Sequence, residues 1–143
     1  MERLKLITAV HLFLIRENKI LLLRRYNTGF QDGNYSVIAG HLDGNESATN
    51  AMLRETQEES GIIIDTNDLR LVHAMHRKSE HERIDLFFTA TNYQGEVQNM
   101  EPNKCDDLSW YPINNLPNNM VPYVRKAIEN YFEGIIYSEF GWE

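Results

Sequence analysis

The most informative stretch of this chain is residues 40–62, which have the sequence GHLDGNESATNAMLRETQEESGI. The stretch predicts one short helix with Glu55, Glu58 and Glu59 at positions i, i+3 and i+4, so that three carboxylates emerge on one side. Like charges at this spacing repel one another and destabilise a helix unless a positive charge lies among them. The pattern therefore indicates a bound metal ion.

A solvated, glutamate-rich surface is the ordinary alternative for such a helix. However, Ala48 and Ala51 fall in the same helical sector as the three glutamates, so the carboxylates continue the small, apolar side. We expect them at the edge of the packed surface, whereas a purely solvated face would point away from it. Arg54 and Glu58 have the i, i+4 spacing of an ion pair that would hold this carboxylate in place.

The same stretch resembles the Nudix box, Gly-x5-Glu-x7-Arg-Glu-U-x-Glu-Glu-x-Gly-U with U aliphatic, which is found in hydrolases of nucleoside diphosphates linked to another group. All fixed residues of this pattern are present. Thr56 departs from it by occupying an aliphatic position, and we expect only a packing adjustment there because threonine is similar in volume to valine. Ile38 stands where many relatives carry proline.

The resemblance implies roles for the box residues. Glu58 and Glu59 are expected to be the core metal ligands, Glu55 a ligand or the general base, and Gly40 a ligand through its backbone carbonyl. Arg54 is expected to orient the catalytic glutamates, and which residue is the general base stays open. The implied cofactor is Mg²⁺, with Mn²⁺ as a substitute, because magnesium prefers oxygen ligands and lowers the pKa of a bound water.

Two further box residues are expected to be supports. Glu46 is predicted to hold the loop and Arg54 in place more than to bind metal directly. Gly61 follows the last predicted helical residue, where a left-handed C-cap is commonly required.

Outside the box, candidate substrate-binding residues come from two regions. Arg24 and Arg25 end a predicted strand, and in relatives an arginine at such a place contacts phosphate; only one of the two can face inward in an alternating strand. Many Nudix enzymes recruit one more carboxylate from a later loop, for which Glu101 is the first candidate, with Glu80 and Glu82 behind it. Solvated surface charge is the alternative for each of these residues.

Other polar and aromatic residues are expected to have structural roles. The cluster at residues 76–78, His-Arg-Lys, is predicted to be a solvated turn, with phosphate binding from a loop as the alternative. His11 lacks metal-ligand spacing with cysteine or a second histidine, so a structural or surface role is expected. Phe30, Trp110 and Tyr111 could stack on a base, but aromatic side chains in a small domain are more often part of the core.

Length and composition indicate a single enzyme domain over residues 1–143. The net charge of −7 and the isoelectric point near 5.2 argue against sequence-independent binding of nucleic acid, which usually requires a basic surface. Cys105 is the only cysteine, so no internal disulfide can form, and a reducing, cytoplasmic location is expected. The apolar run Leu6–Ile15 is shorter than the about 20 residues that span a bilayer, which predicts a strand and no membrane or secretion segment.

The remaining sequence predicts strands and a second helix. The first helix should begin after the N-cap Ser47 and run to about Ser60. The second should follow Asn118-Asn119, with Pro122 in its first turn and Gly134 as its stop. The expected strands are Lys5–Ile15, Ile20–Arg25, Tyr35–Ala39, Leu69–Met75, Ile84–Tyr93 and Leu108–Tyr111.

Strands in a mixed order with two helices predict an α/β or α+β sandwich, and periodicity does not choose between them. The resemblance implies the α/β/α Nudix sandwich with a mixed sheet across nearly the whole chain. The apolar tail Ile135–Trp142 would cover the core or join a partner chain, which leaves a homodimer open.

The function that follows is a Mg²⁺-dependent pyrophosphohydrolase of a small nucleotide. The favoured substrate is a nucleoside triphosphate, oxidised ones included, cleaved to a monophosphate and pyrophosphate. ADP-ribose or another nucleotide sugar is the nearest rival, and the loops Tyr26–Asn34 and Asn99–Ser109 must recognise the part of the substrate beyond its diphosphate. A noncatalytic nucleotide sensor and an RNA-decapping enzyme are further alternatives, although the composition offers little for the basic groove that decapping needs.

Overall fold

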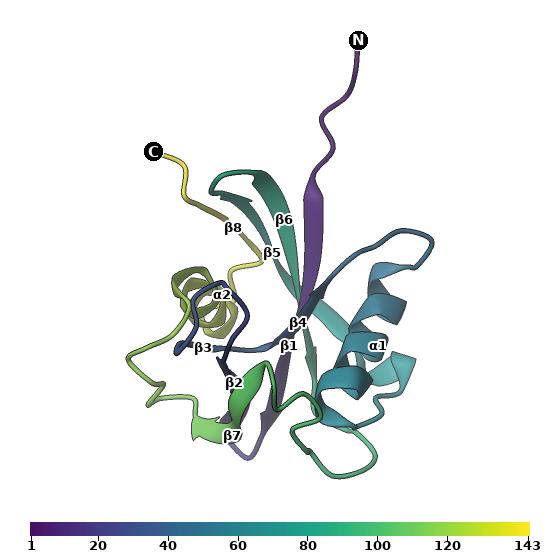
Figure 1. Cartoon of the computed structure of the whole chain (residues 1–143), viewed down its shortest axis with the longest axis vertical. Coiled ribbons are helices and arrows are strands. Elements are labelled where there is room, and N and C mark those ends of the chain that lie inside the picture. The colour runs from purple at the N-terminus through teal and green to yellow at the C-terminus, as the bar shows by residue number, and fades with distance from the viewer.

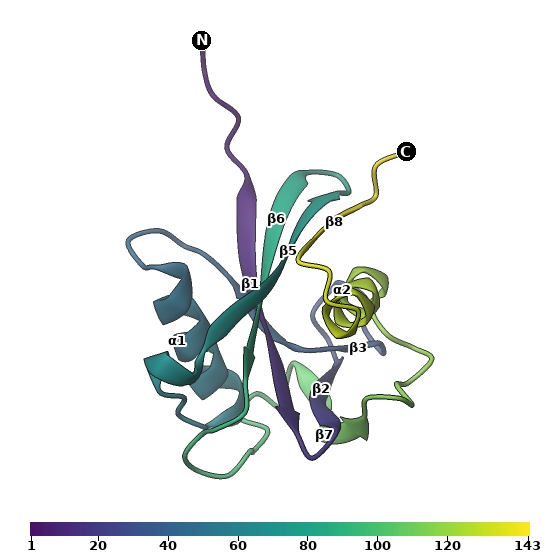
Figure 2. The same cartoon turned by 180° about the vertical axis from the view of Figure 1, so that it is seen from behind.

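The computed structural model describes residues 1–143 and consists of an eight-stranded mixed sheet with one α-helix on each side (Figures 1 and 2). The strands are β1 (Ile7–Arg16), β2 (Lys19–Arg25), β3 (Tyr35–Ser36), β4 (Ile38–His41), β5 (Arg70–Lys78), β6 (Glu82–Ala90), β7 (Cys105–Pro112) and β8 (Tyr137–Phe140). The helices are α1 (Ala48–Ser60), α2 (Pro122–Phe132) and a short 3₁₀ turn, η1 (Thr66–Asp68).

Strand β1 joins two parts of the sheet. Along most of its length it pairs in parallel with β6 and antiparallel with β4, and the order in this part is β4-β1-β6-β5-β8. At its end, Ile15 and Arg16 pair with β2, which also carries β3 and β7. The sheet is therefore mixed, and the predicted α/β class is confirmed.

Two hydrophobic cores lie on opposite faces of the sheet, because successive side chains of a strand point to opposite sides. From β1, Val10, Leu12 and Leu14 belong to the core that α1 covers, whereas Phe13 belongs to the core that α2 covers. Helix α1 contributes Ala51 and Met52 to the first core. Helix α2 contributes Val124, Ala127 and Ile128 to the second. The layers are thus helix, sheet and helix, as the resemblance implied.

The predicted ends of α1 are confirmed. The hydroxyl of Ser47 accepts a hydrogen bond from the backbone N–H of Asn50 at 3.1 Å. Gly61 has a φ of 77°, and its N–H donates to the carbonyl of Gln57. Between these caps Thr56 is fully buried, and its hydroxyl donates to the carbonyl of Met52 at 2.7 Å, so the departure from the box pattern leaves no unsatisfied polar group.

Two predictions about local structure need correction. Residues 76–78 do not form a solvated turn, because β5 extends to Lys78 and Arg77 is 8% exposed, paired with the buried Asp85. The strand predicted at Leu108–Tyr111 begins earlier, at Cys105.

The tail at 135–142 contains β8, which pairs in parallel with β5 at the edge of the sheet. No helix has both the length and the apolar character required to cross a bilayer.

Candidate functional site

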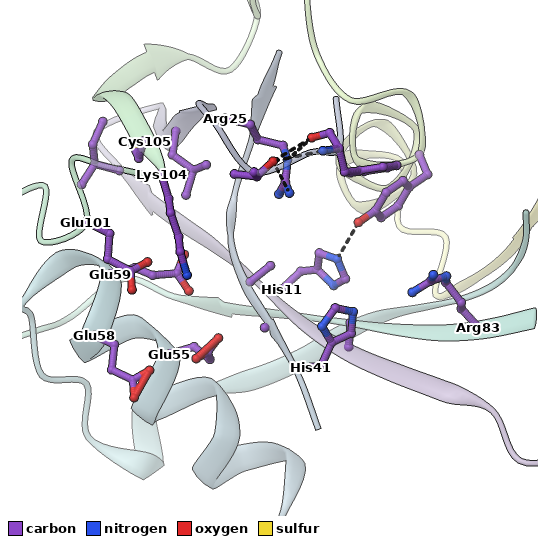
Figure 3. Close-up of a pocket in the computed structure, with 18 of the residues that line it drawn as sticks. His11, Arg25, His41, Glu55, Glu58, Glu59, Arg83, Glu101, Lys104 and Cys105 are labelled. Carbon is purple, nitrogen blue, oxygen red and sulfur yellow. Dashed lines mark hydrogen bonds between the residues drawn. The ribbon is translucent and has the colours of Figure 1, made fainter. Parts of the chain in front are cut away.

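A cavity of about 740 Å³ lies beside the box helix and extends around the edge strand β4. Its lining includes Glu55, Glu58 and Glu59 of α1, together with Gly40 and His41 of β4. Figure 3 shows the three glutamates on one side of this cavity, with Glu101 and Lys104 above them and His11 and Arg83 across from them. The structure thus brings the three box carboxylates to the wall of one cavity, at the edge of the packed surface.

The environment of Glu55 and Glu59 opposes their negative charge. Burial raises the pKa of Glu55 to about 7, a hydrogen bond with Glu58 adds to the rise, and Arg54 opposes it. Burial likewise raises the pKa of Glu59 well above its ordinary value, with further contributions from the charges of Glu55 and Glu101. A cation among these groups would relieve both desolvation and repulsion, and titratable groups perturbed in this way are typical of functional sites.

Arg54 connects the glutamates of α1 with the loop that precedes the helix. Its Nε donates to Glu46 Oε2 at 2.9 Å and its Nη2 to Glu46 Oε1 at 3.0 Å. Its Nη1 donates to Glu55 Oε1 at 2.8 Å and to Glu58 Oε2 at 3.2 Å. The bonds from Arg54 lower the pKa of Glu46 and occupy both of its carboxylate oxygens. This arrangement is consistent with the predicted supporting role of Glu46.

Gly40 lies directly against Glu55. A Cβ atom at this position would overlap the carboxylate and the side-chain carbons of Glu55. Because the backbone of Gly40 does not have a positive φ, the requirement for glycine comes from this close approach and not from the conformation. The backbone of Gly40 therefore lies close to the Glu55 carboxylate.

The donor set fits a magnesium ion that shares its coordination with substrate and water. The structure contains no ready-made group of three or more acidic, histidine or cysteine side chains closed around a metal position. Magnesium is usually held by one or two carboxylates plus substrate phosphates and waters, and a closed protein cage is unusual for it. Glu58 and Glu59, with Glu55 and the Gly40 carbonyl next to them, offer hard oxygen ligands of this kind.

The two adjacent arginines at the end of β2 have different surroundings. Arg25 lines the cavity, where its Nε donates to the carbonyl of Phe30 at 2.6 Å and its Nη2 to the hydroxyl of Thr28 at 3.0 Å. Arg24 is not part of the lining and pairs with Asp106 at 2.7 Å. The predicted alternation therefore holds, and of the two arginines only Arg25 faces the cavity.

The candidate carboxylates after the box lie in two different hollows of the surface. Glu101 lines the cavity with the box glutamates, and its charge raises the pKa of Glu59. Glu80 and Glu82 line a different, smaller hollow near the start of β1, and Glu82 contacts His76 at 3.3 Å. Of the aromatic candidates, Phe30 lines the cavity; Trp110 packs against a core, and Tyr111 bonds to Tyr35 and Asp107.

A second polar group in the cavity wall was not predicted. His11 is 1% exposed, its Nε2 lies 3.1 Å from the hydroxyl of Tyr123, and the two rings meet edge to face. Arg77 donates to Asp85 at 2.7 Å and places its guanidinium 3.7 Å from the centre of the Tyr123 ring. Arg83 lines the same end of the cavity. The available signal was the presence of His11 and Asp85 within otherwise apolar strands.

Comparison with known proteins places the chain in a family. A family model described as "NUDIX domain" matches residues 5–131. The chain is 30% identical over 102 residues to the "NAD-capped RNA hydrolase NudC" of Pseudomonas putida, covering 71% of this chain and 35% of that protein. It is 29% identical over 110 residues to the "ADP-ribose pyrophosphatase" of Methanocaldococcus jannaschii, covering 76% of this chain and 63% of that protein. The chain belongs to the Nudix family.

Solved structures show the same fold. The MutT NUDIX hydrolase from Burkholderia pseudomallei aligns with a TM-score of 0.81 at 23% identity, over 87% of this chain and 97% of that one. The E. coli ORF135 protein aligns with a TM-score of 0.74 at 22% identity, over 90% of each chain. The chain spans about a third of the length of the Pseudomonas relatives that it matches.

Proposed function

We propose that the protein is a magnesium-dependent pyrophosphohydrolase of nucleoside diphosphate derivatives. The observation that carries this proposal is the meeting of three α1 carboxylates and the Gly40 backbone on one wall of a cavity large enough for a nucleotide. The raised pKa values of Glu55 and Glu59 support the proposal, because a bound cation would stabilise the charged forms that burial disfavours. Membership of the Nudix family supports it independently.

Each side chain then has a role. Glu58 and Glu59, with the Gly40 carbonyl, would hold a magnesium ion that the diphosphate also binds. When bound, magnesium neutralises the phosphates and lowers the pKa of a water molecule. Glu55 would accept a proton from the attacking water as the water oxygen bonds to phosphorus and the P–O–P bridge breaks, with the electron pair of the broken bond passing to the leaving phosphate oxygen. Arg54 orients Glu55 and Glu58 through its two hydrogen bonds to them.

The first candidate substrate is a nucleoside triphosphate, oxidised ones included, which would give a monophosphate and pyrophosphate. Its additional phosphate calls for cations beyond the metal, and the cavity offers Arg25 and Lys104, neither of which has an ion pair with a carboxylate. This local positive charge contrasts with the net charge of −7 of the chain. Because the bonds of Arg25 go to a carbonyl and a hydroxyl, its charge remains available to phosphate.

The second candidate is ADP-ribose or another nucleotide sugar. It is favoured by the identity to the ADP-ribose pyrophosphatase of M. jannaschii, a protein of which this chain covers 63%. Both candidates present a diphosphate to the same carboxylates and differ only in the groups beyond it. The NudC relatives add capped RNA to the substances worth testing.

The experiment is a hydrolysis panel with and without magnesium. It comprises nucleoside triphosphates, ADP-ribose, UDP-sugars, dinucleoside polyphosphates, and triphosphorylated and NAD-capped RNA, with products separated by ion-exchange chromatography. We expect turnover of at least one small nucleotide that requires Mg²⁺ or Mn²⁺ and is abolished by Glu58→Gln but retained by Glu80→Gln, a change outside the cavity. Tight nucleotide binding without turnover of any panel member would instead identify a noncatalytic sensor.

A further inference from the structure

The cavity continues beyond the carboxylates to a second, basic end. This end is formed by Arg77 of β5, Arg83 of β6, His11 of β1 and Tyr123 of α2, all of which line the cavity. These residues lie on the face of the sheet that α2 covers, whereas α1 covers the opposite face. The two ends of the cavity meet across the edge strand β4, as Figure 3 shows.

Charges at this end do not cancel. Asp85 is fully buried and bonded to Arg77 by two contacts, at 2.7 and 3.4 Å, so its charge is matched by that arginine. His11 is neutral at pH 7, because burial lowers its pKa to about 4. The charge of Arg83 is therefore left over, and no carboxylate pairs with it. The basic end carries one net positive charge.

Arg83 also lacks a hydrogen-bond partner. Its Nε is buried, and no acceptor in the chain meets it. A buried donor without an acceptor is costly, and native proteins retain few such groups. In Figure 3 the guanidinium of Arg83 points toward the side of the cavity where His11 and His41 lie. An oxyanion in the cavity would bond to the two Nη groups of this guanidinium, which have no partner in the chain and present a planar pair of donors.

The basic end of the cavity lies some distance from the metal-binding end, across the strands and along them. Gly40 pairs with Val10 of β1, and Arg83 pairs with Ile7 of β1 from the other side. Two strand spacings across the sheet and a shift of three residues along it correspond to roughly 14 Å between the two backbones. A substrate that reaches Arg83 from the carboxylates therefore carries its second anionic group beyond the diphosphate, on a sugar or on a group attached to it.

We propose that Arg83 binds an anionic group, a phosphate or a carboxylate, on the part of the substrate remote from the hydrolysed diphosphate. This inference rests on the proposed function and deepens it, because it predicts a preference among nucleoside diphosphate derivatives for those with a second negative group. Arg77 supports the subsite by neutralising Asp85, which would otherwise repel the anion. Tyr123 and His11 form its wall.

Two matched pairs of compounds test the inference. NADP differs from NAD by one phosphate on a ribose, and UDP-glucuronate differs from UDP-glucose by a carboxylate in place of a hydroxymethyl group. Dissociation constants are measured by titration calorimetry in EDTA, so that magnesium-dependent hydrolysis does not interfere, and kcat/KM is measured separately with magnesium. We expect the anionic member of at least one pair to bind about tenfold more tightly than its neutral partner. The pair that responds distinguishes a phosphate from a carboxylate.

Variants assign the preference to Arg83. Arg83→Gln should remove most of the advantage of the anionic member, and Arg83→Lys should retain part of it, because lysine keeps the charge but not the planar pair of donors. Arg70→Gln is the matched control, since Arg70 is an exposed residue of β5 outside the cavity, and it should leave the advantage unchanged. The side chain of Arg83 makes no hydrogen bond within the chain, so Arg83→Gln should leave the melting temperature close to that of the wild type.

The outcomes for the inference and for the proposed function are separable. An equal preference in wild type and Arg83→Gln, or no preference in either pair, would overturn the inference even if every compound is hydrolysed. A preference that depends on Arg83 in the calorimeter would uphold the inference even if no compound is hydrolysed, in which case the proposed function fails by itself.

Discussion

Arg54 binds Glu46 with two parallel hydrogen bonds, of 2.9 and 3.0 Å, and thereby ties α1 to the loop in front of it. The same guanidinium reaches Glu55 and Glu58 with its remaining nitrogen, Nη1. Since lysine cannot make this forked contact, Arg54→Lys should lower kcat about 10- to 100-fold while leaving the fold intact. Steady-state kinetics and circular dichroism check this expectation, and near-normal kcat in the lysine variant would show that orientation of the glutamates is unimportant.

Gly40→Ala tests the close approach of backbone and carboxylate. The added methyl group would overlap Glu55 and force this side chain to a new position. A displacement of about 1 Å at a reacting centre can reduce the rate about 100-fold, so we expect a loss of this order in kcat. A melting curve recorded alongside distinguishes this local effect from unfolding. Unchanged kinetics in a folded Gly40→Ala protein would mean that Glu55 moves aside without consequence.

Glu101 and Glu80 form a matched pair of substitutions. Glu101 lines the cavity and its charge raises the pKa of Glu59, whereas Glu80 lies in a separate hollow. Because affinity for a divalent cation depends on the number of nearby carboxylate charges, Glu101→Gln should raise the magnesium concentration for half-maximal activity by about tenfold. Glu80→Gln should leave that concentration unchanged. The same response in both variants would point to the overall charge of the protein and not to a ligand from this loop.

Thr56→Val restores the aliphatic residue of the box pattern. Valine matches the volume of threonine, and the buried threonine hydroxyl bonds only to the carbonyl of Met52. The loss of this bond and the gain in apolar burial oppose each other, so the free energy of unfolding should change by less than about 1 kcal/mol. Urea denaturation measures this change, and kcat should stay at the wild-type value. A large loss of activity would show that the hydroxyl has a role beyond packing.

The buried His11 predicts a loss of stability in mild acid. Burial lowers its pKa from 6.5 to about 4 in the folded protein, so the unfolded chain takes up the proton first. The neutral histidine therefore contributes stability that is fully present above pH 6.5 and is lost as the pH falls toward 4. Between pH 7 and pH 5 this loss should amount to about 2 kcal/mol.

Substitution isolates this effect from other titrating groups. Unfolding free energies of wild type and His11→Gln are compared at both pH values, and the wild type should lose about 2 kcal/mol more than the variant. His81→Gln, at an exposed position outside both cores, serves as the control and should follow the wild type. An equal acid response in wild type and His11→Gln would contradict a neutral, buried His11.

Local signals explain why α1 and its residues could be predicted. Ser47 and Gly61 mark the two ends of the helix through hydrogen bonds within one turn, and the spacing of the glutamates fixes a common side. The separation of Arg24 from Arg25 was also predictable from alternation, but the choice of Arg25 as the inward residue was not. The pairing of β2 with β7 shifts register between these two residues, and such an irregularity depends on a distant strand.

Non-local contacts account for the features that the sequence did not reveal. His11 meets Tyr123 only because β1 pairs with β6 and α2 packs over both, an arrangement that joins residues far apart in the chain. The strand β8 pairs in parallel with β5, and parallel pairing leaves no hairpin turn to indicate it. The burial of Arg77 is not evident from the sequence, because the run of charged residues at 76–78 is typical of a solvated turn. Its burial depends on the distant partner Asp85.

The edge strand β4 lies between the acidic end and the basic end of the cavity. This separation affects how proteins of this kind could acquire new substrates. The acidic residues of α1 and the basic residues of β5 and β6 are attached to opposite faces of one sheet and share no hydrogen bond with each other. Substitutions near Arg77 or Arg83 can therefore alter which molecule is accepted without disturbing the acidic helix. A descendant of this chain could exchange one selectivity for another in a few mutational steps while keeping its hydrolytic apparatus unaltered.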